Sequence, residues 1–174
     1  MRLPVVDKND EIIGYKNSDE LAADDIIRVS GVWILNSKGE VLVAQRAASK
    51  KYDPLKWAVS AAGTVDEGET YAQNIVKEVQ EELAVAIHES DLILGEHLFV
   101  ETNHLYFYQA YFLRRDIAIE NFKLEEEEVE SVRWISVPEL ARWFAEKPDD
   151  FIPSFYISMK HIEDFCATSA TIPT

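Results

Sequence analysis

The sequence predicts an α/β fold in which helices cover both faces of a mixed β-sheet. Apolar segments typical of strands follow one another across tight turns, which predicts hairpins. Other segments carry apolar residues at helical spacing, and such helices need a sheet face on which to bury their apolar sides. The chain has 174 residues, the length of one ordinary domain, so we expect a single domain spanning residues 1–174.

An N-terminal hairpin is expected over about residues 1–16. Two apolar pairs, Val5-Val6 and Ile12-Ile13, flank the turn-forming run Asp7-Lys8-Asn9-Asp10. A short helix is expected next, at residues 18–22.

A second hairpin is predicted between residues 29–35 and residues 41–44. The intervening sequence is Asn36-Ser37-Lys38 followed by Gly39, and glycine supplies the positive φ that such a turn often needs. A polar loop then leads to Thr70.

A helix is predicted to begin at Thr70. The spacing of Thr70 and Gln73 suits a capping box, in which each residue satisfies a free backbone N–H of the first turn. Apolar residues then recur at helical intervals, so one side of the helix is expected to be buried; they are Ile75, Val76, Val79 and Leu83.

The C-terminal half is expected to contain three strands and two helices. The strand at residues 105–113 is apolar nearly throughout, which predicts that both of its faces are covered. Proline is favoured in the first turn of a helix. The expected order is strands at 92–100, 105–113 and 132–135, a helix from Pro138 to about 146, and an amphipathic segment at about 154–165.

The charge and cysteine content narrow the possible partners and location. The net charge of −15 disfavours a nucleic-acid polymer as partner, whereas a divalent cation can neutralise a small anionic substrate locally. The only cysteine is Cys166, so no internal disulfide forms and a reducing compartment, the cytoplasm, is expected. The sequence has no signal-peptide stretch and no membrane-spanning run, so no membrane association is expected.

The predicted helix carries an acidic face. A period of 3.6 residues per turn places Glu78, Glu81 and Glu82 on one side. Crowded carboxylates repel one another, and Mg²⁺ relieves this repulsion because it prefers hard oxygen ligands and bridges carboxylates to phosphate oxygens. The alternative is a solvated helix face on which Lys77 is only an i,i+4 partner of Glu81.

The segment 63–85 resembles the Nudix box, G-x5-E-x7-R-E-U-x-E-E-x-G-U, where U is a bulky aliphatic residue. Two positions depart from it: Lys77 replaces Arg, and Ala84 replaces Gly. Lys77 keeps the positive charge but loses the planar fork of arginine. Ala84 lacks the conformational freedom of glycine, so a left-handed conformation at the helix C-terminus is less expected. The matching positions are Gly63, Glu69, Lys77, Glu78, Val79, Gln80, Glu81, Glu82, Leu83, Ala84 and Val85.

This resemblance implies a Nudix-type α/β/α sandwich and a metal-dependent hydrolase that cleaves a phosphoanhydride bond in a small diphosphate, such as a nucleoside diphosphate linked to another group. The cofactor is Mg²⁺ or Mn²⁺, and a homodimer is plausible for the family. Glu78 and Glu82 are the implied direct metal ligands, with Glu81 as a ligand or water-mediated partner and the Gly63 carbonyl adding an oxygen. Lys77 is expected to hold Glu69 in the Nudix loop.

The chain also resembles isopentenyl diphosphate isomerases, which share the Nudix fold. Arg46 and Lys50 match isomerase positions that contact the substrate diphosphate, and a guanidinium beside an ammonium suits an anion; the alternative is a pair of ordinary surface cations. The isomerase cysteine that precedes the box glycine is Ala62 here, and the metal-binding histidine that follows is Thr64. Isomerisation therefore lacks part of its proton-transfer pair.

The run Glu125-Glu126-Glu127-Glu128 is expected to lie in a loop before the strand at 132–135. Such a run is often only a solvated segment. Many Nudix hydrolases place a metal ligand or general base in this loop, and Glu127 or Glu128 is preferred because they lie nearest the strand. Three classes of function thus remain open: a diphosphate hydrolase, an isomerase-like enzyme, and a module that binds nucleotides without cleaving them.

Overall fold

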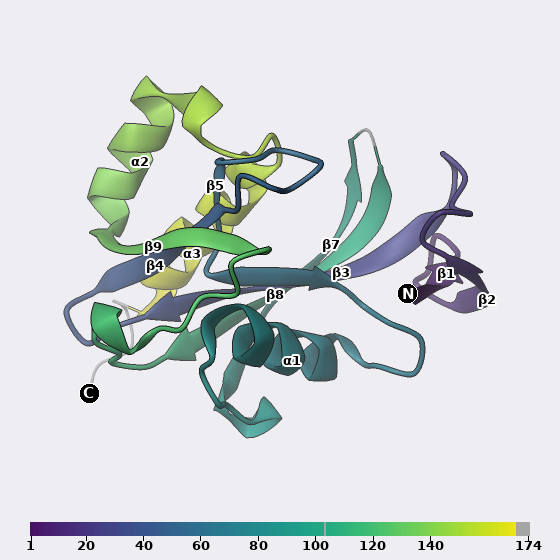
Figure 1. Cartoon of the computed structure of the whole chain (residues 1–174), viewed down its shortest axis with the longest axis horizontal. Coiled ribbons are helices and arrows are strands. Elements are labelled where there is room, and N and C mark those ends of the chain that lie inside the picture. The colour runs from purple at the N-terminus through teal and green to yellow at the C-terminus, as the bar shows by residue number, and fades with distance from the viewer. Residues whose placement is uncertain (103, 170–174) are drawn as a thin grey trace.

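The computed structural model of the protein describes residues 1–102 and 104–169. Within these residues the strands form one nine-stranded sheet. Helix α1 (Tyr71–Leu83) covers one face, and α2 (Val137–Glu146) and α3 (Phe155–Ser169) lie on the other (Figure 1). The predicted α/β/α sandwich is therefore confirmed.

Strand β3 is the centre of the sheet. It pairs antiparallel with β1, β4 and β6 and parallel with β8, so the sheet is mixed as predicted. The strands are β1 (Arg2–Val6), β2 (Ile12–Asn17), β3 (Ile26–Leu35), β4 (Glu40–Arg46), β5 (Trp57–Ala58), β6 (Ala61–Thr64), β7 (Leu92–Glu101), β8 (Leu105–Arg114) and β9 (Val129–Ser136).

Alternating residues of β3 divide the core into two layers. Val32 and Ile34 pack with the buried side of α1, whereas Trp33 and Leu35 pack with α2 and α3. This is the period-two alternation of a strand that is covered on both faces. Strand β8 is buried from Phe107 to Leu113, which confirms the expectation that it is covered on both sides.

The N-terminal hairpin forms as predicted, but the helix expected at residues 18–22 is wrong. That segment is a turn followed by irregular chain. The carboxylate of Glu20 accepts the backbone N–H of Asn17 at 3.1 Å, and that of Asp25 accepts the N–H of Ala22 at 2.7 Å. Side-chain acceptors thus satisfy backbone donors locally and compete with helical hydrogen bonds.

The second hairpin and the C-terminal helices agree with the sequence pattern. Gly39 has φ of 78°, and its N–H donates to the carbonyl of Asn36 at 3.1 Å. Ser136 caps α2, with Pro138 in the first turn. The predicted strand at 132–135 is longer than expected, because β9 pairs with β4 along Val129–Ser136.

Two short strands lie within the segment that was expected to be a polar loop. β6 pairs with β3, setting Gly31 opposite Ala62 and Ser30 opposite Gly63. This pairing holds Gly63 directly beside α1. In the described part of the chain, no helix is long and apolar enough to cross a membrane.

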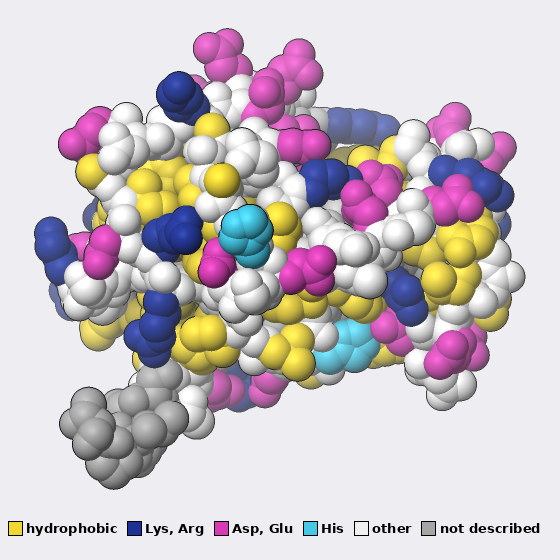
Figure 2. All heavy atoms as spheres, turned by 90° about the horizontal axis from the view of Figure 1, so that it is seen from below, with side chains coloured by type: hydrophobic (Ala, Val, Ile, Leu, Met, Phe, Trp, Pro, Cys, Tyr) yellow, Lys and Arg dark blue, Asp and Glu magenta, His cyan; other side chains and the backbone are white. Residues whose placement is uncertain are grey.

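The surface carries no concentrated basic area on the face shown in Figure 2. Lys and Arg side chains are scattered among acidic ones there. Together with the net charge of −15, this distribution gives a polyanion little to bind on that face.

Candidate active site

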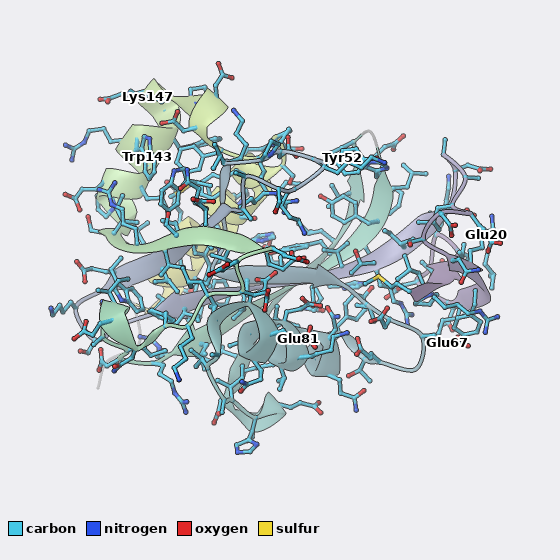
Figure 3. All side chains as sticks on the ribbon, in the orientation of Figure 1. Glu20, Tyr52, Glu67, Glu81, Trp143 and Lys147 are labelled. Atoms are coloured by element: carbon cyan, nitrogen blue, oxygen red, sulfur yellow. The ribbon has the colours of Figure 1, made fainter. Side chains whose placement is uncertain are left out.

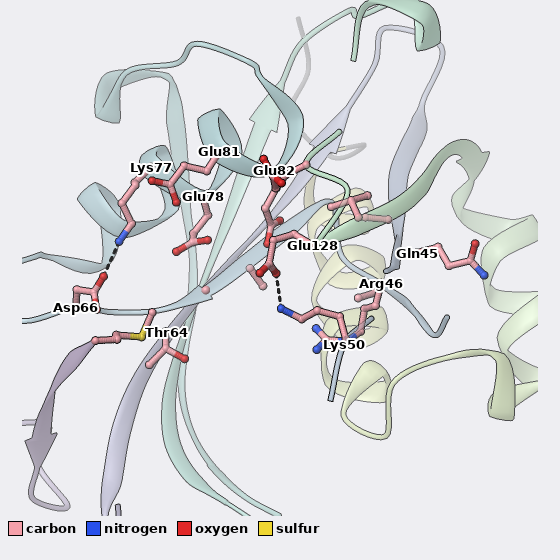
Figure 4. Close-up of a pocket in the computed structure, with 17 residues that line it drawn as sticks. Gln45, Arg46, Lys50, Thr64, Asp66, Lys77, Glu78, Glu81, Glu82 and Glu128 are labelled. Atoms are coloured by element: carbon pink, nitrogen blue, oxygen red, sulfur yellow. Dashed lines mark hydrogen bonds and ion pairs between the residues drawn. The ribbon is translucent and has the colours of Figure 1, made fainter. Parts of the chain in front are cut away.

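A cavity of about 690 Å³ brings together most of the residues that the sequence singled out. It lies between α1, β6, the end of β4 and the loop that precedes β9 (Figure 4). The predicted site residues that line it are Gly63, Lys77, Glu78, Glu81, Glu82, Arg46 and Lys50, and Asp66, Glu125 and Glu128 join them.

Helix α1 starts and ends as its sequence demands. The Thr70 hydroxyl accepts the N–H of Gln73 at 3.1 Å, and the Gln73 side chain accepts the N–H of Thr70 at 3.0 Å. At the other end Ala84 adopts the left-handed conformation, with φ of 55° and ψ of 34°. The substitution of glycine by alanine therefore leaves this helix end intact.

Gly63 is required by the close approach of Glu78. A Cβ atom built on Gly63 would lie 2.3 Å from the carboxyl group of Glu78, far inside a normal contact distance. Glycine lets β6 and the first of the helical glutamates share this space, whereas a larger residue would displace the Glu78 carboxyl group. The box glycine thus has a steric explanation in this chain.

Lys77 joins the Nudix loop to α1. Its ammonium lies 2.8 Å from the carboxylate of Asp66 and 2.8 Å from that of Glu69, which shows that it is not simply an i,i+4 partner of Glu81. Burial alone would raise the pKa of Glu69, but hydrogen bonds from Lys77 and Asn74 lower it overall. Glu69 is therefore held ionised and in place.

Glu78 and Glu82 are costly to ionise where they lie. Burial is the main cause that raises the pKa of Glu78 to about 7, and the charge of Glu81 adds to it. Burial likewise raises the pKa of Glu82 to about 8, followed by the charges of Glu78 and Glu128. A cation in the cavity would stabilise both carboxylates, so this hard-oxygen donor set fits a divalent ion such as Mg²⁺.

The carboxylates face one cavity but are not already arranged as ligands. Among the residues that the structure describes, no group of three His, Cys, Asp or Glu side chains is placed to hold an ion. Glu78, Glu82 and Glu128 point toward the same space in Figure 4. Binding an ion through three of these carboxylates therefore requires side-chain rotations, which the groups that hold each carboxylate restrict.

The two predicted substrate-binding cations line the cavity, and each has a partner. The guanidinium of Arg46 donates through Nε and Nη2 to the carbonyl oxygen of Tyr52, at 3.2 and 3.1 Å. Lys50 forms an ion pair with Glu128 (Figure 4). Arg46 thus also shapes its own loop, whose tip carries the exposed Tyr52 (Figure 3).

A second hollow of about 570 Å³ adjoins the first and shares Arg46, Lys50 and Glu128 with it. Lys51 lies 5.0 Å from the ring centroid of Tyr52, so this hollow combines cations with an aromatic surface. The sequence pattern did not single out Lys51 or Tyr52, since a basic loop with one tyrosine resembles any surface loop.

A turn in the acidic run 125–128 directs its glutamates to different places. Backbone hydrogen bonds from Glu128 and Val129 to the carbonyl of Glu125 form the turn, and the N–H of Glu125 donates to the carbonyl of Glu82. Glu125 and Glu128 line the main cavity, whereas Glu127 lines only the second hollow. Of the two preferred residues, the structure places Glu128 beside the helical glutamates.

The positions that distinguish an isomerase also line the cavity. Ala62 and Thr64 flank Gly63 on β6 and border the cavity. The only cysteine, Cys166, lies on α3, on the opposite face of the sheet from α1. No thiol is therefore available where an isomerase would use one.

Comparison with known proteins agrees with this geometry. A NUDIX domain model matches residues 26–155. An uncharacterized Nudix hydrolase of Listeria monocytogenes is 30% identical over 156 residues, covering 88% of this chain and 89% of the relative. An isopentenyl-diphosphate Delta-isomerase of Photorhabdus laumondii is 31% identical over 99 residues, 56% of each chain.

A solved structure supports the same assignment. The crystal structure of a Deinococcus radiodurans protein superimposes with a TM-score of 0.72 at 26% identity, covering 84% of this chain and 90% of that one. The chain therefore belongs to the Nudix hydrolase family, and it is a hydrolase that acts on phosphoanhydride bonds.

Proposed function

We propose that the protein hydrolyses a small diphosphate, of the type in which a nucleoside diphosphate is linked to another group, and that it requires Mg²⁺ or Mn²⁺. One observation carries the proposal: three helical glutamates and the two cations Arg46 and Lys50 line the same cavity. Carboxylates suit the metal and cations suit the phosphates, so a single space serves both.

Each group has a role in this proposal. Glu78 and Glu82 would hold the ion, with Glu81 and the Gly63 carbonyl as further oxygen donors. A bound divalent ion acidifies water and neutralises charge on the departing phosphate. Arg46 and Lys50 hold the diphosphate, while the hollow beside Tyr52 receives the group attached to it.

Glu128 is the proposed general base. It borders the cavity next to Glu82, and its ion pair with Lys50 fixes its direction. A carboxylate so placed can take a proton from the attacking water. Because Lys50 is also proposed to hold the substrate phosphates, substrate binding would release Glu128 from its ion pair with Lys50.

The experiment that tests the proposal is a substrate panel with Mg²⁺ and product identification. It contains nucleoside diphosphate sugars, dinucleotides, CoA, deoxynucleotides and isopentenyl diphosphate. We expect phosphate-bearing hydrolysis products from at least one compound. Dimethylallyl diphosphate formed from isopentenyl diphosphate would instead establish an isomerase, and tight binding without any turnover would establish a binding module.

Removing the cations should raise KM. For Arg46→Ala we expect a KM at least roughly tenfold higher, because a lost charge-assisted contact costs about 1.5–3 kcal/mol. Lys50→Ala should raise KM less, since a single ammonium gives a less directional contact. Steady-state kinetics on the substrate found in the panel measures both, with the solvent-exposed Lys38→Ala as control. Unchanged KM in both variants would mean that they are ordinary surface cations.

We also propose a cytoplasmic location. The basis is the single cysteine. A chain with one cysteine cannot form an internal disulfide, which is the bond that an oxidising compartment would favour.

A further inference from the structure

Asn74 is a buried amide in the middle of the carboxylate cluster. Its side chain is fully buried, with 0% exposure, and it lies on α1 one turn before Glu78. A buried amide without partners would be destabilising, so its contacts identify its role. The Nudix box leaves this position unspecified, so the motif alone does not predict these contacts.

The Asn74 amide nitrogen faces three oxygen acceptors. It lies 3.1 Å from the carbonyl oxygen of Thr64, 3.1 Å from Oε2 of Glu69 and 3.2 Å from Oε1 of Glu78. On the opposite side, Asn74 Oδ1 accepts the hydroxyl of Ser30 at 2.6 Å. One side chain thus links β3, β6, the Nudix loop and α1.

These partners fix the orientation of the amide. A backbone carbonyl and an ionised carboxylate only accept hydrogen bonds, so the NH₂ group and not the carbonyl oxygen of Asn74 must face Thr64 and Glu69, and it then also lies beside Glu78. The Ser30 hydroxyl, buried at 0% exposure, holds the other end. Two N–H groups serve three acceptors, and the amide therefore holds both carboxylates close to the β6 backbone.

We propose that Asn74 is a positioning residue that aims the Glu78 carboxylate at the metal site. This rests on the proposed function, in which Glu78 is a metal ligand. Because the cavity glutamates are not already arranged as ligands, their carboxylates must turn to bind an ion, and the hydrogen bond from Asn74 restricts the directions in which the Glu78 carboxylate can turn. Gly63 leaves room for the same carboxylate, because a Cβ atom there would lie 2.3 Å from it, and Asn74 supplies the directed hydrogen bond.

The test is a titration of the protein with Mn²⁺ in the absence of substrate. Electron paramagnetic resonance measures the concentration of the free ion and hence the affinity. Loss of a group that orients a metal ligand typically weakens metal binding about 10–100-fold, and we expect that weakening for Asn74→Ala. Val79→Ala is the matched control, because Val79 is also fully buried on α1 but packs in the apolar core. It should lose stability and keep the Mn²⁺ affinity of the wild type.

A second measurement uses the wild-type protein, so its result does not depend on whether the Asn74→Ala variant folds. The side-chain amide of Asn74, observed by ¹⁵N NMR, should shift saturably on addition of diamagnetic Mg²⁺. An Asn74→Ala variant with wild-type Mn²⁺ affinity, or an Asn74 amide that does not respond to Mg²⁺, would overturn the inference and leave the proposed function standing. A wild-type protein that binds neither ion would overturn both.

Discussion

Glu82→Gln and Glu78→Gln are each expected to lower kcat by roughly 10³-fold or more, equivalent to about 4 kcal/mol of transition-state stabilisation. Glutamine keeps the shape of each side chain but removes the negative charge that a divalent ion needs. In Glu78→Gln the amide oxygen can still accept from Asn74, so local packing is preserved. Single-turnover kinetics at saturating Mg²⁺ measures the loss.

Folding of the Glu82→Gln variant provides the internal control. The pKa of Glu82 is raised from 4.5 to about 8, first by burial. A raised carboxyl pKa means that ionisation costs stability, a cost absent below about pH 4.5 and growing as pH rises toward 8. Without metal, the variant should therefore melt at or above the wild-type Tm at pH 8, and the difference should shrink toward pH 5.

These two readouts separate chemistry from stability. An inactive variant with an equal or higher Tm has lost a catalytic group and not its fold. Near-wild-type kcat in both variants would contradict the assignment of the helical face as the metal site.

The second largest effect is expected at the acidic run. Glu128→Gln should lower kcat by about 10²–10⁴-fold, the usual contribution of a positioned general base. Glu126→Gln is the matched control on the same turn, because its side chain borders neither the main cavity nor the second hollow. Glu125→Gln should have an intermediate effect, since it lines the cavity without the Lys50 ion pair.

The pH dependence adds a separate test of Glu128. Loss of a general base removes the acidic limb of the kcat profile, whereas loss of a structural contact leaves its shape unchanged. A flat series across all four positions would mean that the run is only a solvated loop.

The parts of the fold that could be predicted depend on local signals. Thr70 and Gln73 form the capping box that their spacing indicates, and Gly39 takes the positive φ expected of it. Such features are decided by residues a few positions apart, so sequence patterns find them. The apolar run of β8 similarly indicated burial on both faces.

Other parts depend on partners distant in sequence. β5 and β6 are too short to show a pattern, and β6 exists because it pairs with β3 about thirty residues earlier, as Gly31 opposite Ala62 shows. The helix expected at 18–22 was wrong because Glu20 and Asp25 bind backbone N–H groups there. Competition between local hydrogen bonds is not visible in periodicity alone.

The candidate site likewise combines residues that a local motif predicts with residues whose roles depend on partners distant in sequence. The helical glutamates, Gly63, Glu69 and Lys77 follow from the spacing of one motif. Asp66 and Asn74 were missed, because their roles come from contacts with Lys77 and with two carboxylates that only the folded chain brings together. Proximity to β9 does not separate Glu127 from Glu128, whereas the folded turn places Glu128 at the main cavity and Glu127 only at the second hollow.

Metal dependence of the wild-type reaction tests the central claim most directly. The protein is freed of metal with a chelator and assayed on the substrate found in the panel, and Mg²⁺ or Mn²⁺ is then added back in excess. We predict that hydrolysis falls to background without metal and returns in full with either ion. Hydrolysis at an unchanged rate in the presence of excess chelator would contradict the account.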